Sequence, residues 1–146
     1  MEKLRIQNDE VYRIEVNDNG EYIEFDLLDI ELPIKAMRLS DNLKKEKKIY
    51  NNRCSILQKE YGNNSKLLLY KQYDLDREFC LKFRKMFDEF LGEGACKKIF
   101  GDTNRIAMFD KLFEELSPHF DKLKINVEKV KNNLYEKYIK NSKEVI

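Results

Sequence analysis

The sequence has no tryptophan, and it has only two prolines and five glycines among its 146 residues. So few glycines and prolines exclude a collagen-like repeat and a linker-rich chain, while nine phenylalanines and eight tyrosines argue against disorder. The length is typical of one domain that can bury a core, and no internal repeat is visible. We expect a single domain over residues 1–146, with an acidic β-hairpin region over 1–32 and a helical body over 33–146.

Long apolar runs are also missing. No run approaches the roughly 18 residues that a membrane-spanning helix needs. Residues 1–6 lack the continuous apolar stretch of a secretory signal. We therefore expect a soluble protein that has no membrane partner.

Cysteine and histidine are too few and too widely spaced for a metal site. Cys54, Cys80 and Cys96 form no CxxC pair and His119 is the one histidine, so neither a zinc site nor a disulfide framework is indicated. We expect reduced thiols that pack as small hydrophobes in an intracellular compartment. No motif supports a catalytic cysteine acting with His119.

Motifs of catalysis and cofactor binding are absent as well. The sequence has no P-loop, dinucleotide-binding, nucleophile-elbow or zinc-protease pattern. The two carboxylate pairs have structural explanations: Asp74 or Asp76 as a helix N-cap, and Asp29 with Glu31 on the solvated face of a strand. We expect no enzyme activity, no metal and no cofactor.

The charges nearly cancel, with 28 Lys and Arg against 27 Asp and Glu, but they are unevenly distributed. Residues 1–33 carry ten acidic and three basic side chains, whereas residues 34–61 carry eight basic and three acidic ones. The basic run 44–48 interrupts the apolar stripe of its helix, which is typical of a solvated segment that projects from a domain. This asymmetry favours contacts between protein chains, including copies of this one, and disfavours nucleic acid as a partner.

The fold class predicted from periodicity is mainly α, or α+β when an N-terminal β-hairpin is included. Apolar and polar residues alternate on both sides of Asn19-Gly20, so the hairpin spans about 11–27. A third strand, formed by residues 28–32 or by residues 4–6, is left open.

Four to five helices follow, and they cover about 33–61, 66–91, 95–100, 105–116 and 118–140. The first is about 43 Å long if it is continuous, which favours a projecting or partner-contacting helix. Residues 102–104 offer an N-cap for the fourth helix.

Phenylalanine is concentrated between residues 79 and 120. A helix face formed by Phe79, Phe83, Phe87 and Phe90 is typical of a core, and an exposed groove that grips another chain's helix is the alternative. The last helix carries a short coiled-coil-like seam that either packs on the core or meets a partner. The seam consists of Phe120, Leu123, Val127, Val130 and Leu134.

Two stretches resemble a known family. Residues 14–25, ahead of Leu32-Pro33, resemble the start of small tail proteins from bacteriophages of Gram-positive bacteria. Residues 87–118 are similar to a segment of phage tail assembly chaperones that contains Gly-Glu-Gly, Phe-Gly-Asp and a later proline. Leu91 and Ala95 depart from that pattern, which has an aromatic residue and a Thr or Ser there, so a side-chain cap is missing after the turn.

The resemblance implies a tail assembly chaperone that binds the phage tape-measure protein, with the tail-tube protein as a second partner. It implies reversible binding without catalysis in the cytoplasm of the bacterial host. From the uneven charge distribution we also expect self-association. The candidate partner-binding residues are Phe90, Gly92, Glu93, Gly94, Phe100, Gly101, Phe120, Leu123, Val127, Val130 and Leu134. Two alternatives stay open: a structural tail or head–tail component retained in the virion, and a small phage regulator that binds a host protein.

Overall fold

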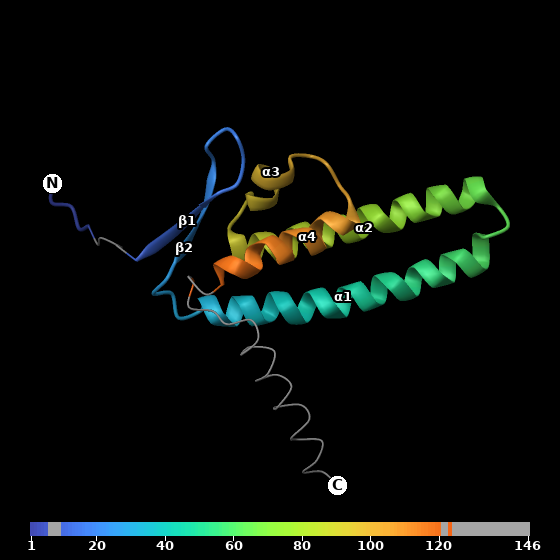
Figure 1. Cartoon of the computed structure of the whole chain (residues 1–146), viewed down its shortest axis with the longest axis horizontal. Coiled ribbons are helices and arrows are strands. Elements are labelled where there is room, and N and C mark those ends of the chain that lie inside the picture. Colours follow the sequence, from blue (N-terminus) through green and yellow to red (C-terminus); the bar gives the residue numbers. More distant parts are fainter. Residues whose placement is uncertain (6–9, 121–122, 124–146) are drawn as a thin grey trace, which may run out of the picture.

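The structure is a computed structural model of the chain, and it describes residues 1–5, 10–120 and 123. The described part is mainly helical, with an antiparallel two-stranded β-hairpin followed by four α-helices (Figure 1). This confirms the predicted fold class. The single-domain interpretation stays a prediction.

The β-hairpin consists of β1 (Val11–Glu15) and β2 (Tyr22–Asp26). Ile23 and Phe25 on β2 are buried, whereas Tyr22, Glu24 and Asp26 on the opposite face are exposed. The alternation of apolar and polar residues therefore predicted the buried face correctly. In the described residues these two strands make up the sheet, and residues 28–32 do not add the third strand that was left open.

Asn17 organises the turn of the hairpin. Its side-chain oxygen accepts hydrogen bonds from the N–H groups of Asn19 and Glu21. Its amide donates to the backbone carbonyl of Lys98, with the nitrogen and oxygen 3.0 Å apart. Gly20 adopts a φ of 78°, the left-handed conformation for which Asn-Gly is typical. One side chain thus shapes the turn and ties it to the helical body.

The segment between the hairpin and the first helix is a turn because Asp29 satisfies local backbone groups. Its carboxylate accepts a hydrogen bond from the N–H of Glu31 at 2.9 Å, and its backbone carbonyl accepts one from Leu32. The same carboxylate lies 3.9 Å from the Lys35 ammonium. An Asp that bonds the backbone two residues on favours a turn over strand pairing, so the strand-face explanation of Asp29 and Glu31 is wrong.

Two long helices, α1 (Leu32–Tyr61) and α2 (Ser65–Leu91), form an antiparallel helical hairpin (Figure 1). Its 30 residues make α1 about 45 Å long, which confirms the continuous first helix. Asn64 caps α2, because its side chain accepts a hydrogen bond from the first turn at 3.1 Å. Asp74 and Asp76 lie inside an unbroken α2, so the N-cap explanation of these two residues is wrong.

The basic run 44–48 is partly solvated and partly paired with other helices. Its lysines at 44, 45 and 48 are exposed, as the solvated interpretation predicted. Glu46 lies 3.8 Å from Lys82 of α2, and Lys47 lies 2.5 Å from Asp110 of α4 (Ile106–Leu116), so the projecting interpretation is wrong. Over this stretch ion pairs between helices replace apolar contacts, and the apolar periodicity does not record them.

Two shorter helices, α3 (Ala95–Phe100) and α4 (Ile106–Leu116), follow α2, and η1 (Ser117–His119) is a 3₁₀ helix. The predicted starts of three helices are each wrong by one residue, the usual uncertainty at a helix end. The predicted helix over 118–140 overlaps η1, and its remainder lies outside the described residues except for residues 120 and 123.

The expected N-cap of α4 in residues 102–104 is wrong. Arg105 occupies the N-cap position, without a hydrogen bond from its side chain. The Asn104 side chain and the Thr103 carbonyl instead accept hydrogen bonds from the Arg84 guanidinium, at 2.8 and 2.6 Å. Arg84 of α2 thereby fastens the loop that leads into α4.

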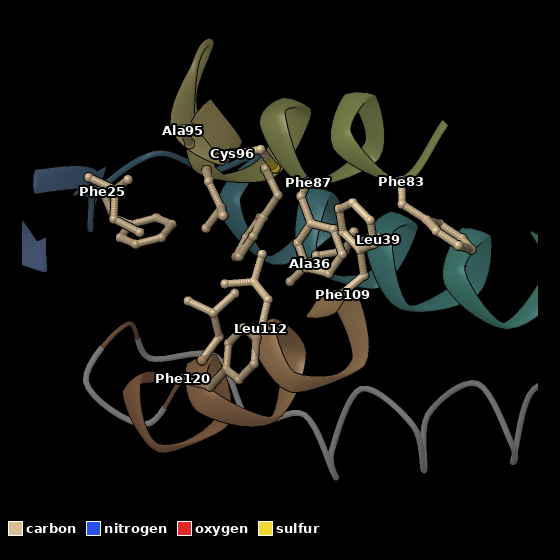
Figure 2. Close-up of a cluster of buried hydrophobic side chains, with 14 of the residues drawn as sticks. Phe25, Ala36, Leu39, Phe83, Phe87, Ala95, Cys96, Phe109, Leu112 and Phe120 are labelled. Carbon is tan, nitrogen blue, oxygen red and sulfur yellow. The ribbon is translucent and has the colours of Figure 1, made fainter. Parts of the chain in front are cut away.

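The core lies where β2, α3 and α4 cover one half of the α1–α2 hairpin (Figure 2). Phe87 and Phe109 stack there with ring centroids 5.9 Å apart, and Phe83 lies 5.4 Å from Phe109. This arrangement confirms the core interpretation of the phenylalanine stripe. The buried apolar residues are Ile23, Phe25, Leu32, Ala36, Leu39, Leu75, Phe79, Cys80, Phe83, Phe87, Phe90, Leu91, Ala95, Cys96, Phe109, Leu112, Leu116, Phe120 and Leu123.

Candidate protein-binding surface

The Gly92-Glu93-Gly94 turn reverses the chain between α2 and α3. Gly92 and Gly94 have φ angles of 110° and 78°, which L side chains rarely adopt. The N–H of Ala95 donates to the Gly92 carbonyl at 3.1 Å and closes the turn. Glu93 is exposed at its tip, beside a groove of about 540 Å³ that the turn shares with β2.

Asp88 supplies the cap that Ala95 cannot provide. Its carboxylate accepts a hydrogen bond from the N–H of Cys96, with oxygen and nitrogen 2.8 Å apart. This acceptor lies at the N-terminus of α3, where free N–H groups and the helix dipole favour a negative charge. The cap comes from the preceding helix, eight residues earlier, so a search of the turn itself does not find it.

Most other predicted partner-binding residues lie in or beside the core. Phe90, Phe120 and Leu123 are buried, and the rings of Phe90 and Phe120 lie 6.1 Å apart. Phe100 and Gly101 are half-buried at the end of α3, with the Phe100 ring 5.7 Å from Phe109. Val127, Val130 and Leu134 lie outside the described residues. A partner-binding role for this set stays a prediction.

The far half of the helical hairpin has a different character. We call residues 51–74 the distal arm; all of them are described, and none is buried. Five large apolar side chains on the arm are exposed: Ile56, Leu67, Leu69, Tyr70 and Tyr73. Figure 1 shows α1 and α2 continuing beyond the first residue of α4 into this arm.

One row of α2 side chains runs through both halves of the hairpin. Leu69, Tyr73, Cys80, Phe83 and Phe87 lie at spacings of four, seven, three and four residues, so they share a helix face, which we call the α2 stripe; Asp76 lies on this face between Tyr73 and Cys80. Cys80, Phe83 and Phe87 are at most 2% exposed in the core. Leu69 and Tyr73 are 69% and 59% exposed, so within the described residues the stripe is covered at one end and open at the other.

The sequence contains a signal for this open end that the periodicity analysis missed. Leu67, Leu68 and Leu69 are consecutive, and Tyr70 follows them. Successive helical residues point in directions about 100° apart, so a single turn of this composition is apolar all around and cannot turn every side chain toward α1. Such a turn needs a second covering surface.

A polar cluster joins the two helices where the core ends and the arm begins. The Tyr50 hydroxyl donates a hydrogen bond to the Asp76 carboxylate at 2.6 Å, and the Gln72 amide donates to the same oxygen at 2.8 Å. Burial and the nearby Asp76 carboxylate both raise the pKa of Tyr50, so the phenol stays neutral. These directional bonds hold α1 in register with α2 as apolar packing thins.

The open end of the stripe has a positively charged border. A groove of about 440 Å³ separates Tyr73 from the start of α4 and is lined by Arg77 and Arg105. Among the described residues neither of these guanidinium groups has an ion-pair partner. The surface therefore combines apolar side chains with cations that are free to meet an acidic partner.

A protein-family model described as a family of unknown function, DUF6673, matches residues 19–144. The chain belongs to DUF6673. The match begins in the β-hairpin turn and includes β2 and all four helices, so the covered core and the distal arm both lie within the part shared with DUF6673. The searches of curated proteins and of solved structures found no significant match.

The described part of the chain contains neither a membrane-spanning helix nor a cluster of metal ligands. None of its helices combines the length and the hydropathy of a membrane span. Its His, Cys, Asp and Glu side chains form no group of three that could hold a metal ion.

Proposed function

We propose that this DUF6673 protein is a phage tail assembly chaperone that binds the tape-measure protein and keeps it soluble while the tail tube forms. The proposal rests on the resemblance of residues 14–25 and 87–118 to such chaperones. In this proposal the protein acts in the host cytoplasm, by reversible binding without catalysis.

One structural observation carries the proposal: the distal arm exposes Leu69, Tyr70 and Tyr73 side by side on one helix. Contiguous exposed apolar side chains on a small protein typically mark a surface that another chain covers. An aggregation-prone helix presents apolar side chains at the same spacing, so each surface can remove the other from water.

The covered half of the hairpin supports the arm in this role. The aromatic core around Phe87 fixes the direction of α1 and α2, and the Tyr50–Asp76 bond continues that constraint to the first turns of the arm. A surface held in place before it binds loses less conformational entropy on binding. The protein can therefore present the arm without the partner's help.

Co-expression tests the proposal. The partner is the product of the long reading frame that neighbours this gene, produced alone, with this protein, or with an unrelated helical protein of similar size. We expect a soluble complex that co-purifies through a tag on either chain, and an insoluble partner in the other two cultures. A partner that stays insoluble in the presence of this protein contradicts the proposal.

Purified virions separate the chaperone from a retained tail component. A chaperone that leaves during tube growth should be absent from mass spectra of the particles, whereas a structural component should be present in fixed proportion to the tube protein. Purification of a host protein with the tagged chain, in place of the tape-measure protein, would favour a regulator.

A further inference from the structure

The covered half of the α2 stripe already shows what kind of element fits it. There α4 lies against the stripe, with the Phe109 ring 5.4 Å from Phe83 and 5.9 Å from Phe87. Asp110 of α4 pairs with Lys47 of α1 at 2.5 Å, so α4 contacts both helices of the hairpin. The occupant is an amphipathic helix with apolar residues toward the stripe and an acidic residue toward α1.

The same face of α2 continues past the start of α4. α4 begins at Ile106, and the loop before it is held down by Arg84 through Asn104 and Thr103. Beyond Ile106 the stripe continues with Tyr73 and then Leu69 on the same face of an unbroken α2. The distance from Leu69 to Tyr73 is about one helical turn, and with Arg77 the open surface spans about two.

The charge around the open end selects among helices. Arg77 and Arg105 border it, and their two positive charges outnumber that of Asp76, the acidic residue of the same groove, which accepts hydrogen bonds from Tyr50 and Gln72. A helix with acidic side chains beside its apolar face gains two ion pairs here, whereas a basic helix meets like charge. α4 itself has this composition, with Asp110, Glu114 and Glu115 beside its apolar residues.

We propose that the open end of the α2 stripe, formed by Leu69 and Tyr73 and bordered by Arg77 and Arg105, binds an acidic amphipathic helix of the partner protein, seated end to end with α4. The occupant extends the interface that α4 forms with the same stripe. This inference rests on the proposed function, because it takes the ligand to be another protein chain, and it names the site and the chemistry of the binding segment.

A peptide that repeats the α4 sequence twice is a suitable probe. The 11 residues of α4 make three turns at 3.67 residues per turn, which is close to the period of an α-helix, so the apolar residues of two consecutive copies lie nearly on one face. A peptide of 22 residues also forms a helix more readily than one of 11. The peptide carries a fluorophore, and its binding to the full-length protein is followed by fluorescence anisotropy. A peptide of the same composition with its apolar residues redistributed is the control probe.

We expect saturable binding of the repeat peptide and none of the redistributed one. The double variant L69E/Y73E should weaken binding at least about tenfold, because it puts charge into the apolar contact. The control I56E adds one negative charge to an exposed apolar residue of the arm that lines a different groove, and it should bind like the wild type. The variant R77A/R105A should bind more weakly and lose most of the salt dependence.

Three results would overturn the inference. The first is a wild-type protein that does not bind the repeat peptide. The second is equal binding by wild type and L69E/Y73E, because the peptide would then bind elsewhere, for example by displacing α4 from the core. The third is a wild-type dimer that L69E/Y73E converts to a monomer in sedimentation velocity, because a second copy then covers the stripe. Circular dichroism of each variant verifies that its helices are intact.

The co-expressed complex separates this inference from the proposed function. A tape-measure complex that forms equally with wild type and L69E/Y73E leaves the chaperone function standing and overturns the helix site. If the wild type forms no complex but binds the repeat peptide through Leu69 and Tyr73, the proposed function fails and the site remains.

Discussion

The two halves of the α1–α2 hairpin share a sequence pattern and differ in what surrounds it. In the covered half, Phe83 and Phe87 lie under α4 and are almost completely buried. In the distal arm, Leu69 and Tyr73 continue the same stripe and are mostly exposed. The comparison teaches that one helix can contribute to the core at one end and present a binding surface at the other.

The same difference separates the residues that determine stability from those that present the binding surface. Burial of apolar surface is the dominant favourable term in folding, so the half that contains the core should determine the free energy of unfolding. The free energy of local unfolding is lower for segments with few buried contacts than for the core, and residues 51–74 are such a segment. Five experiments sharpen or break this comparison.

Truncation of one apolar side chain in each half should give the largest contrast. Phe87→Ala removes a fully buried ring and should lower the free energy of unfolding by about 3–5 kcal/mol. Leu69→Ala removes an exposed side chain and should change it by less than about 0.5 kcal/mol. Urea denaturation followed by circular dichroism measures both, and similar losses for the two variants would contradict the division.

Thiol reactivity compares the halves without a substitution. All three cysteines are free; Cys54 lies half-buried in the arm, whereas Cys80 and Cys96 are buried in the core. Burial raises the pKa of Cys80, and it raises the pKa of Cys96 to about 12. Iodoacetamide at pH 8 should therefore modify Cys54 at least about a hundredfold faster, as measured by mass spectrometry of peptides. Equal rates would mean that the core opens as readily as the arm.

The Cys96 thiol also predicts a dependence of stability on pH. Its pKa rises from 9.0 in the unfolded chain to about 12 in the folded protein, so above pH 9 the unfolded state loses a proton that the folded state keeps. The free energy of unfolding should fall as the pH rises from 9 toward 12. Cys96→Ala should flatten this part of the profile, and an unchanged slope in that variant would assign the effect to other groups.

Removal of the α3 cap should have a medium effect that is confined to the covered half. Asp88→Ala leaves the N–H of Cys96 without its acceptor and should cost about 1 kcal/mol. Glu89→Ala removes a neighbouring carboxylate that makes no such bond and is the matched control. If Asp88→Ala is as stable as wild type in urea, solvent replaces the cap at no cost.

The ion pair between Lys47 and Asp110 should contribute least. Both side chains are about half exposed, so Lys47→Met should lower the free energy of unfolding by about 0.2–1 kcal/mol, and less at high salt. Urea titrations at two salt concentrations measure the difference. A loss above 2 kcal/mol would show that α4 is held on the hairpin mainly by this pair.

Regular periodicity was enough to predict most of the fold. The alternation around Asn19-Gly20 identified the hairpin, and the glycines at 62, 92 and 101 marked the ends of three helices. These features are local: each depends on residues within a few positions of one another, which a single sequence displays. The phenylalanine stripe likewise indicated its own burial.

Contacts between distant residues could not be predicted in the same way. The ion pairs of Glu46 and Lys47 join the basic run to other helices, and their partners are distant in the sequence. Asp88 caps α3 from inside α2, and Arg84 holds the residues that sequence reasoning assigned to the α4 cap. The exposure of Leu69 and Tyr73 depends on where α4 begins in space, which no local pattern encodes.

The bonds that fasten the β-hairpin carry a consequence for the order of folding. Tyr12 bonds to His119 and Asn17 bonds to Lys98, across separations of 107 and 81 residues. In contrast, a short turn connects α1 to α2, so those helices can pair from nearby contacts with a small loss of chain entropy. During synthesis the strands emerge before the helices, and these two bonds form only after residues 98–119 have been made. The hairpin is thus made before the helices and secured in full only after α3 and α4 are in place.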